Sequence, residues 1–311
     1  MTQFLDGTEI NQQLDWPSLI AQLKDWFTAS KVQAPERQIC TIEQPDGSTA
    51  SLLIMPAWIP GQAIGVKVVT FFPQNASQGL STINAGYLSF DGQTGQLRAV
   101  MEGDALTEQR TAAASALAAS YLARKNAKRL LVVGTGQLAR SVATAHAAVR
   151  SYDSIHIWGR TSSKAQTVAE DLQALGLPAA ATTDLQTACR GADVISTVTA
   201  STRPIIHGEW LKPGTHLDLI GAFQPNMRES DTKAITQANL FVDNPVGALQ
   251  AGDLATPLTE GAIQESHISA TLTDLCQGSS KGRKSNTEYT VFKSVGMALE
   301  DLAAASLIRV P

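Results

Sequence analysis

Apolar residues recur at two different spacings in the first hundred residues. Between residues 8 and 30 they follow a near-helical period, which predicts one helix with a packed apolar face: Leu14, Leu19, Ile20, Leu23 and Phe27. From residue 38 onward, short apolar segments alternate with turn sequences such as Pro45-Asp46-Gly47 and Pro60-Gly61. This pattern predicts five strands, at residues 39–42, 50–55, 65–70, 83–90 and 97–101.

The pattern changes again after residue 105. Residues 106–125 are rich in Ala and Leu, which predicts a long helix. Residues 129–133 are an apolar run typical of a buried parallel strand, and a glycine turn and a predicted helix to Val149 follow it. Further strands are predicted at 155–158, 194–199, 216–220 and 240–242, with helices at 164–175 and 290–307. Such alternation predicts an α/β protein, with a Rossmann-type parallel sheet beside the strand-rich α+β part.

Length and composition narrow the class of protein. A chain of 311 residues exceeds the size at which one core usually stops growing, so two domains are expected. The formal charge of -4 provides no positive field for nucleic acid or an anionic membrane surface. The first residues lack a basic and apolar leader, and no apolar run reaches the roughly 18 residues that span a bilayer. We therefore expect a cytoplasmic protein without nucleic-acid or membrane partners.

Cysteine and histidine residues give no metal-binding pattern. Cys40, Cys189 and Cys276 lie far apart, and none belongs to a Cys/His ligand spacing. The five histidines show no pair four residues apart. No metal site is predicted, and the thiols are expected to be buried and structural.

Residues 134–139 match the G-x-G-x-x-G/A fingerprint of dinucleotide-binding turns. In that motif the first glycine permits a tight turn, the second lets a pyrophosphate approach, and the third small residue lets helix and strand pack closely. The helix N-terminus then favours the phosphates through its free amides. The bland alternative is a glycine turn without a ligand. The predicted cofactor-binding residues here are Gly134, Thr135, Gly136, Gln137 and Leu138.

The end of the second predicted strand bears on which dinucleotide is bound. An NAD-preferring domain usually carries an acid there, whereas this chain has Arg160, Thr161 and Ser162. A guanidinium with neighbouring hydroxyls suits a 2′-phosphate, so NADP(H) is favoured and NAD(H) is kept as the alternative. The other reading is a solvated loop in which Thr161 or Ser162 only caps the next helix. Thr199, at the end of the predicted strand 194–199, is a further candidate for cofactor binding.

Several segments together carry a family resemblance. They are Leu53-Ile54-Met55-Pro56-Ala57, Gly65-Val66-Lys67-Val68-Val69, Arg110-Thr111-Ala112-Ala113-Ala114-Ser115, the glycine turn, Arg228-Glu229 and Phe292-Lys293-Ser294-Val295-Gly296. With these segments in this order, the chain resembles the ornithine cyclodeaminase/mu-crystallin family. The resemblance implies a substrate-binding and dimerisation domain of residues 1–115 with 291–311, a Rossmann domain of residues 116–290, and a homodimer.

The resemblance also implies that Arg37, Lys67 and Arg110 surround a substrate carboxylate. The chemistry is reasonable, because a guanidinium fixes a carboxylate plane and a lysine can also donate a proton. Lys67 is therefore the candidate catalytic residue. The competing readings are a solvated face of the strand for Lys67, a surface position for Arg110 and an ordinary loop position for Arg37.

The chain departs from the cyclodeaminases of that family in its acidic residues. The position that matches their aspartate is Phe223, and no Asp or Glu occurs between Asp46 and Asp91. A substrate ammonium buried without a carboxylate is costly, so ornithine is disfavoured. Ser230 replaces a usual leucine without a functional explanation, and Asp253 is read as a cap or as a loop-orienting residue.

These observations predict an NADP(H)-dependent reductase of a cyclic ketimine carboxylate, such as Δ1-pyrroline-2-carboxylate. Hydride would pass to the C=N bond while basic residues hold the carboxylate. The alternatives are an ornithine cyclodeaminase that uses NAD, an amino-acid dehydrogenase acting on alanine, and a non-catalytic protein that binds NADPH and a small ligand, as mu-crystallin does.

Overall fold

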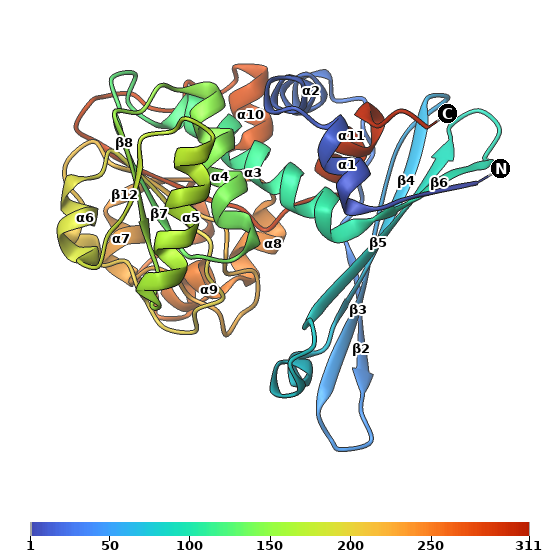
Figure 1. Ribbon diagram of the computed structural model, residues 1–311, viewed down its shortest axis with the longest axis horizontal. Helices are drawn as coiled ribbons and strands as arrows, with labels where there is room; N and C mark the ends of the chain where they lie inside the picture. The colour runs from blue at the N-terminus through green and yellow to red at the C-terminus, as the bar shows by residue number, and fades with distance from the viewer. Residues whose placement is uncertain (1, 311) are drawn as a thin grey trace. The chain divides into compact units, whose positions relative to one another are not determined.

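The computed structural model describes residues 2–310, and the chain forms two compact units (Figure 1). The first unit runs to Arg110 and also includes the residues from Met297 onward. The second unit is Thr111–Gly296. The first unit is thus assembled from two segments that lie far apart in the sequence.

A six-stranded sheet forms the centre of the first unit. Its order is β1 (Gln3–Leu5), β6 (Leu97–Glu102), β5 (Ile83–Asp91), β4 (Ala63–Phe71), β3 (Thr49–Ile59) and β2 (Gln38–Glu43). All neighbours pair antiparallel except β1, which pairs parallel with β6. The five predicted strands are confirmed. The three-residue β1 is too short to give an alternating pattern and was not predicted.

The single helix predicted for residues 8–30 is wrong, because two helices occupy this segment. They are α1 (Gly7–Gln13) and α2 (Trp16–Ala29), separated by the extended residues Leu14 and Asp15. The Asp15 carboxylate accepts a hydrogen bond of 2.9 Å from the backbone N–H of Ser18 and so caps α2. The apolar period continues across the break, which is why spacing alone did not reveal it.

The two faces of this sheet differ in burial. Met55, Ala57 and Ile59 on one face are buried with Ala298 and Leu302 of α11 (Ala298–Leu307). The opposite face presents apolar side chains that remain partly exposed: Ile54, Trp58, Ile64, Val66, Val68 and Leu88. One face therefore packs within the unit, and the other is apolar and only partly covered.

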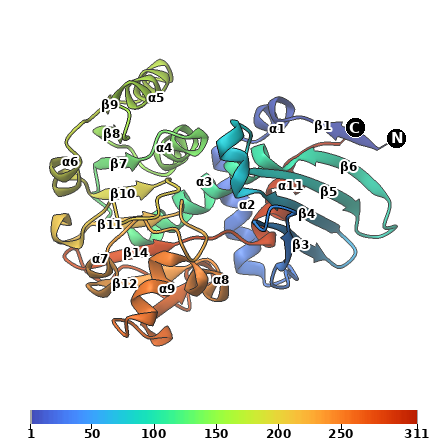
Figure 2. The same cartoon turned by 90° about the horizontal axis from the view of Figure 1, so that it is seen from below.

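The second unit contains an eight-stranded sheet that is parallel throughout (Figure 2). Its order is β13 (Ile268–Thr271), β12 (Ala238–Val242), β14 (Tyr289–Lys293), β11 (His216–Leu219), β10 (Val194–Thr197), β7 (Arg129–Val133), β8 (Ser154–Trp158) and β9 (Ala179–Ala181). This confirms the predicted α/β class with a Rossmann-like parallel sheet and a second, mixed sheet.

Helices flank this sheet, and α4 and α6 lie on opposite sides of it in Figure 2. The helices of this unit are α4 (Gln137–Val149), α5 (Ser162–Ala174), α6 (Leu185–Gly191), α7 (Thr232–Thr236), α8 (Pro245–Gln250), α9 (Gly252–Thr259) and α10 (Leu272–Gln277). The long α3 (Gly103–Leu122) begins in the first unit and ends in the second. None of the helices in residues 2–310 has the length and apolar character needed to cross a bilayer.

The predicted helix at 290–307 is partly wrong. Its first residues form β14, which lies between β11 and β12, and only Ala298–Leu307 is helical. Val291 and Phe292 are both fully buried, as in strands covered on two faces, and such a run lacks the alternation that marks a strand. Gly296 then turns the chain with φ of 74°.

The expectation of three buried thiols is also corrected. Only Cys189 is buried, whereas Cys40 on β2 is exposed and Cys276 is partly exposed. β2 forms the edge of its sheet, and most of its side chains face solvent.

We expect Asp15→Ala to lower the free energy of unfolding by about 1 kcal/mol, because it removes the cap of α2. Urea unfolding followed by circular dichroism measures the change. Asp25→Ala, an exposed site on the same helix, is the control. Equal stability of the two variants would contradict the assigned cap.

Candidate functional site

The turn after β7 has the geometry of a phosphate-binding loop. Gly134 has φ of 133°, and a Cβ there would lie 2.6 Å from Val198 Cγ2, so only glycine fits. Gly136 is exposed at the N-cap of α4, and a Cβ there would meet no atom within 4 Å. A ligand can therefore approach the backbone of Gly136 and the first amides of α4, which begins at Gln137. This turn fits a dinucleotide pyrophosphate.

The end of β8 lies against the same turn. A Cβ on Gly159 would be 2.5 Å from Thr135 Cγ2, so the two loops touch. Arg160, Thr161 and Ser162 follow and are exposed. Thr161 stands at the N-cap of α5 but makes no side-chain capping hydrogen bond. The capping alternative is thus not what the structure shows, and a role in binding a 2′-phosphate stays a prediction.

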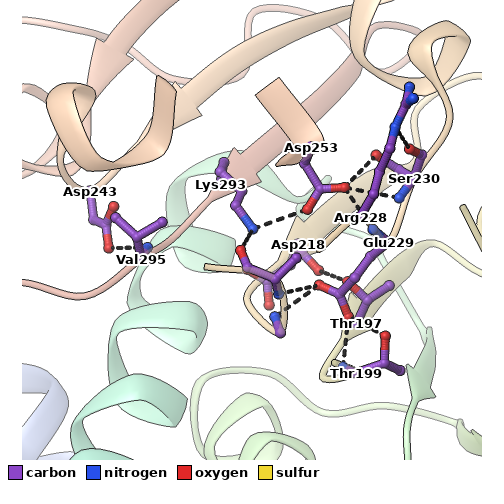
Figure 3. A network of polar contacts seen from close by, with 12 residues as sticks. Thr197, Thr199, Asp218, Arg228, Glu229, Ser230, Asp243, Asp253, Lys293 and Val295 are labelled. Atoms are coloured by element: carbon purple, nitrogen blue, oxygen red, sulfur yellow. Dashed lines mark hydrogen bonds and ion pairs between the residues drawn. The ribbon is translucent and has the colours of Figure 1, made fainter. Parts of the chain in front are cut away.

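The loops after β10 and β11 are joined by one buried carboxylate. Glu229 accepts hydrogen bonds from the N–H of Thr199 at 2.6 Å and from its hydroxyl at 2.8 Å (Figure 3). It also accepts from the N–H of Gly221 at 2.8 Å. Thr199, predicted as a cofactor-binding residue, therefore forms hydrogen bonds within the protein. It lies at the carboxyl ends of the parallel strands, where dinucleotides bind in folds of this type.

Asp253 and Ser230 belong to the same group of contacts. Asp253 accepts from the N–H groups of Glu229 at 2.8 Å and Ser230 at 3.0 Å, and it pairs with Lys293 at 3.1 Å. Of the two readings, the loop-orienting one therefore describes Asp253. Ser230 also turns its hydroxyl to Asp253 at 3.3 Å, a bond that a leucine at this position could not make.

A serine, histidine and aspartate also meet inside the second unit. Ser115 Oγ lies 2.8 Å from His146 Nε2 and donates to the carboxylate of Asp218. All three side chains are fully buried, and Asp218 bonds the serine rather than orienting the histidine from its far nitrogen. This group therefore lacks the order of contacts of a nucleophilic triad, in which the histidine lies between the serine and the acid.

The first unit brings together a buried group of charges. Lys67 on β4 donates to Asp301 at 2.7 Å and to Thr107 at 3.2 Å. Arg110 on α3 donates to Asp301 at 2.9 Å and to Glu300 at 2.7 Å. Lys67 is 2% exposed and Arg110 5%, so neither residue lies on a solvated face. The surface readings of both residues are wrong.

The two acids of this group were missed at the sequence level. Glu300 and Asp301 come from the first turn of α11, 190 and 191 residues after Arg110. Their position beside α11 apolar residues is the signal that could have found them, since acids in a buried stripe need cationic partners. Carboxylates are therefore present beside Lys67, although no Asp or Glu occurs between Asp46 and Asp91.

Burial and neighbouring charges tune Lys67. Burial and the positive charge of Arg110 lower the pKa of Lys67 to about 8, although the carboxylate of Asp301 acts in the opposite direction. The half-buried Arg37 lies near enough for its charge to make a smaller contribution to this lowering of the pKa. The structure thus brings Arg37, Lys67 and Arg110 into one electrostatic group.

Tyr87 borders Lys67 in the sheet, because the two residues pair across β4 and β5. Its hydroxyl is buried without a hydrogen-bond partner among the described residues. Burial, and secondarily the charge of Asp301, raise the pKa of Tyr87 well above its usual value. Tyr87 is therefore neutral. No group of His, Cys, Asp and Glu side chains within residues 2–310 is arranged to hold a metal ion.

Comparison with known proteins adds the following similarities. The model of the ornithine cyclodeaminase/mu-crystallin family matches residues 6–310. An uncharacterised protein of Schizosaccharomyces pombe is 42% identical, over 98% of this chain and 96% of its own. A Delta(1)-pyrroline-2-carboxylate reductase of Bacillus cereus is 40% identical, over 96% of this chain and 91% of its own.

Two solved structures extend the comparison. Delta(1)-pyrroline-2-carboxylate reductase of Thermococcus litoralis, in complex with NADH and L-proline, has a TM-score of 0.92 and 32% identity, and the match covers 99% and 96% of the two chains. An archaeal alanine dehydrogenase dimer with bound NAD has a TM-score of 0.91 and 29% identity, with 99% and 94% covered.

Replacing Asp301 should expose its effect on Lys67. Because the Asp301 carboxylate raises the pKa of Lys67, Asp301→Asn is expected to move that pKa below about 8. A titration by NMR with lysine labelled at Cε measures it. Thr107→Val removes a neutral acceptor and should leave the pKa nearly unchanged. A larger shift in Thr107→Val than in Asp301→Asn would contradict the pairing.

Proposed function

Since the chain belongs to the ornithine cyclodeaminase/mu-crystallin family, we propose that it is a reductase of cyclic ketimine carboxylates such as Δ1-pyrroline-2-carboxylate, with NADPH as the favoured cofactor. The observation that carries the proposal is the buried group of Lys67, Arg110 and Asp301, in which a proton donor and an anion-binding group lie side by side. Relatives named for this activity, such as the Bacillus cereus protein, support it.

In the proposed reaction, the basic residues bind the substrate carboxylate. The guanidinium of Arg110 is oriented by Glu300 and Asp301, so its plane is fixed before the substrate arrives. Arg37 adds a second guanidinium to the same field. A guanidinium is planar and charged, so it binds the carboxylate of the substrate better than it binds the uncharged part of the ring.

Lys67 is the proposed proton donor. The reduced nicotinamide supplies a hydride to the imine carbon when it is bound. Lys67 Nζ gives a proton to the imine nitrogen and regains one from solvent, so one C=N bond becomes a CH–NH bond with one proton consumed. A lysine with a pKa of about 8 is protonated at neutral pH yet releases its proton readily.

The cyclodeaminase reading is weaker in this chain. Phe223 stands in the loop after β11, where the matching acid is absent. Glu300 and Asp301 do supply carboxylates, but each forms an ion pair with Lys67 or Arg110. A substrate ammonium would have to break a buried pair to gain a partner, which is costly. Alanine dehydrogenation and ligand binding without turnover remain as outcomes of the assays below.

We expect the wild-type protein to oxidise NADPH in the presence of Δ1-pyrroline-2-carboxylate, and Lys67→Met to lose about 10²-fold or more of kcat/KM. Since the protonated lysine is the donor, wild-type kcat/KM for reduction should fall as pH rises through about 8. Lys67→Arg should lose kcat/KM as well, because a guanidinium stays protonated and does not give up the proton that the reaction consumes.

Absorbance at the NADPH band measures these rates, and ammonia release from ornithine and reduction of the oxidised cofactor by alanine are assayed in parallel. Lys24→Met, an exposed site on α2, is the control. Turnover of ornithine without imine reduction would overturn the proposal. Tight NADPH binding without turnover of any imine or amino acid would favour the binding protein.

The preference for NADPH rests on Arg160. We expect Arg160→Ala to weaken NADPH binding roughly tenfold or more while NADH binding changes little, because only NADPH carries the 2′-phosphate. Isothermal titration calorimetry with both nucleotides measures this. Arg190→Ala, also exposed in the second unit, is the control. Equal losses for NADPH and NADH would show that Arg160 does not select the cofactor.

A homodimer is the proposed assembly, because the face of the first sheet opposite α11 is apolar and only partly covered. Val66 and Val68 both project from this face of β4. A charge there would be costly to bury against a second copy, so Val68→Glu should convert a dimer into a monomer. Sedimentation equilibrium measures the mass, with the exposed Gln62→Glu as control. A monomeric wild type would refute the assembly.

A further inference from the structure

The strand order of the second unit divides its loops into two groups. From β7 the sheet continues in one direction through β8 and β9 and in the other through β10, β11 and β14. In folds of this type the dinucleotide lies across the point where the order reverses, and each half binds one mononucleotide. The glycine turn and Arg160 belong to the β7 and β8 half, which takes the adenosine part. The loops after β10 and β11 therefore take the nicotinamide part.

These two loops are held by the side chain of Glu229. One carboxylate oxygen accepts from the N–H and the hydroxyl of Thr199, and the other accepts from the N–H groups of Gly221, at 2.8 Å, and Ala222, at 3.2 Å. A Cβ on Gly221 would lie 2.2 Å from Thr199 N, so the loops are in direct contact. One fully buried residue thus fixes the backbone of both loops (Figure 3).

Asp253 and Lys293 hold Glu229 in turn. Asp253, at the start of α9, accepts from the N–H of Glu229. Lys293, the last residue of β14, pairs with the other oxygen of Asp253 and donates to the carbonyl of Ala222. Both side chains are fully buried. The carbonyl of Ala222 and its N–H are therefore both bound, by Lys293 and by Glu229.

The charges of this group are not arranged for stability alone. Burial, and then the nearby carboxylate of Asp253, raise the pKa of Glu229, while the cation of Lys293 opposes them. Buried ion groups of this kind seldom stabilise a fold more than apolar residues of the same volume would. What they provide here is a set of directed hydrogen bonds to the backbone of two loops.

We propose that Glu229, Asp253 and Lys293 form a clasp that positions the loops at Thr199 and at Gly221–Ala222 for the nicotinamide half of the cofactor. The proposal rests on the proposed function, because it assumes that a nicotinamide dinucleotide binds. Glu229 is a positioning residue that acts through the backbone of these loops. The adenosine half is bound by the other group of loops and does not depend on the clasp.

The test compares NADPH with 2′-phospho-ADP-ribose, the same molecule without nicotinamide, by calorimetry on the full chain. In Glu229→Gln, an amide NH2 replaces one of the two accepting oxygens and faces the N–H donors of one loop. We expect NADPH binding to weaken about tenfold, and 2′-phospho-ADP-ribose binding to change by less than about twofold. A purely structural role would weaken both ligands alike.

A second variant keeps the test decisive if Glu229→Gln does not fold. Thr199→Val removes one hydroxyl donor without uncovering a buried charge, and it should show a smaller loss confined to NADPH. Lys293→Met should likewise weaken the binding of NADPH and leave the binding of 2′-phospho-ADP-ribose nearly unchanged. Lys281→Met, at an exposed site in the same unit, is the control for this variant.

The outcomes distinguish a failure of the clasp from a failure of the proposed function. Equal loss of both ligands, or no loss of NADPH affinity in the folded variants, overturns the clasp and leaves the proposed function standing. A wild-type protein that binds neither ligand overturns the proposed function and the clasp with it. Wild-type binding with a loss confined to NADPH supports both.

Discussion

The first unit depends on the two ion pairs that the carboxylate of Asp301 forms with Lys67 and Arg110. Lys67 and Arg110 lie almost completely buried, and a buried cation without a counter-charge is costly. Asp301 satisfies both at once, so the central strand β4, the start of α3 and α11 must meet at one point. The same contact that permits burial also orients the guanidinium and keeps the lysine charged. The ion pairs of Asp301 therefore both stabilise the first unit and arrange its buried cations.

The pairing explains why part of the site was visible in the sequence and part was not. Lys67 interrupts an apolar strand, and Arg110 directly precedes the Ala-rich run of α3, so both stand out locally. Glu300 and Asp301 do not, because their significance arises only when α11 packs against β3 and β4. The glycine turn was readable for the opposite reason, since its strand, turn and helix are contiguous and carry the motif within a few residues.

The errors in the secondary structure have similar causes. The break at Leu14 and Asp15 depends on a cap rather than on apolar spacing, and the spacing was the signal used. Residues 289–293 pair with β11 and β12, far away in sequence, and burial on both sides removed the polar positions that would have marked a strand. Local patterns gave the buried strand at residues 129–133 as well as the half-exposed strands of the first unit, and they failed where a cap or a pairing far away in sequence decided the element.

The first unit is built from both ends of the described chain, and this affects the order of folding during synthesis. Residues 111–296 leave the ribosome as one continuous segment and can pack as soon as β14 emerges to take its place between β11 and β12. The first unit cannot be completed then, because Lys67 and Arg110 still lack the carboxylates of Glu300 and Asp301. The acids of α11 then pair with cations that were translated some two hundred residues earlier. The second unit can thus be complete before the first, although the first unit begins earlier in the chain.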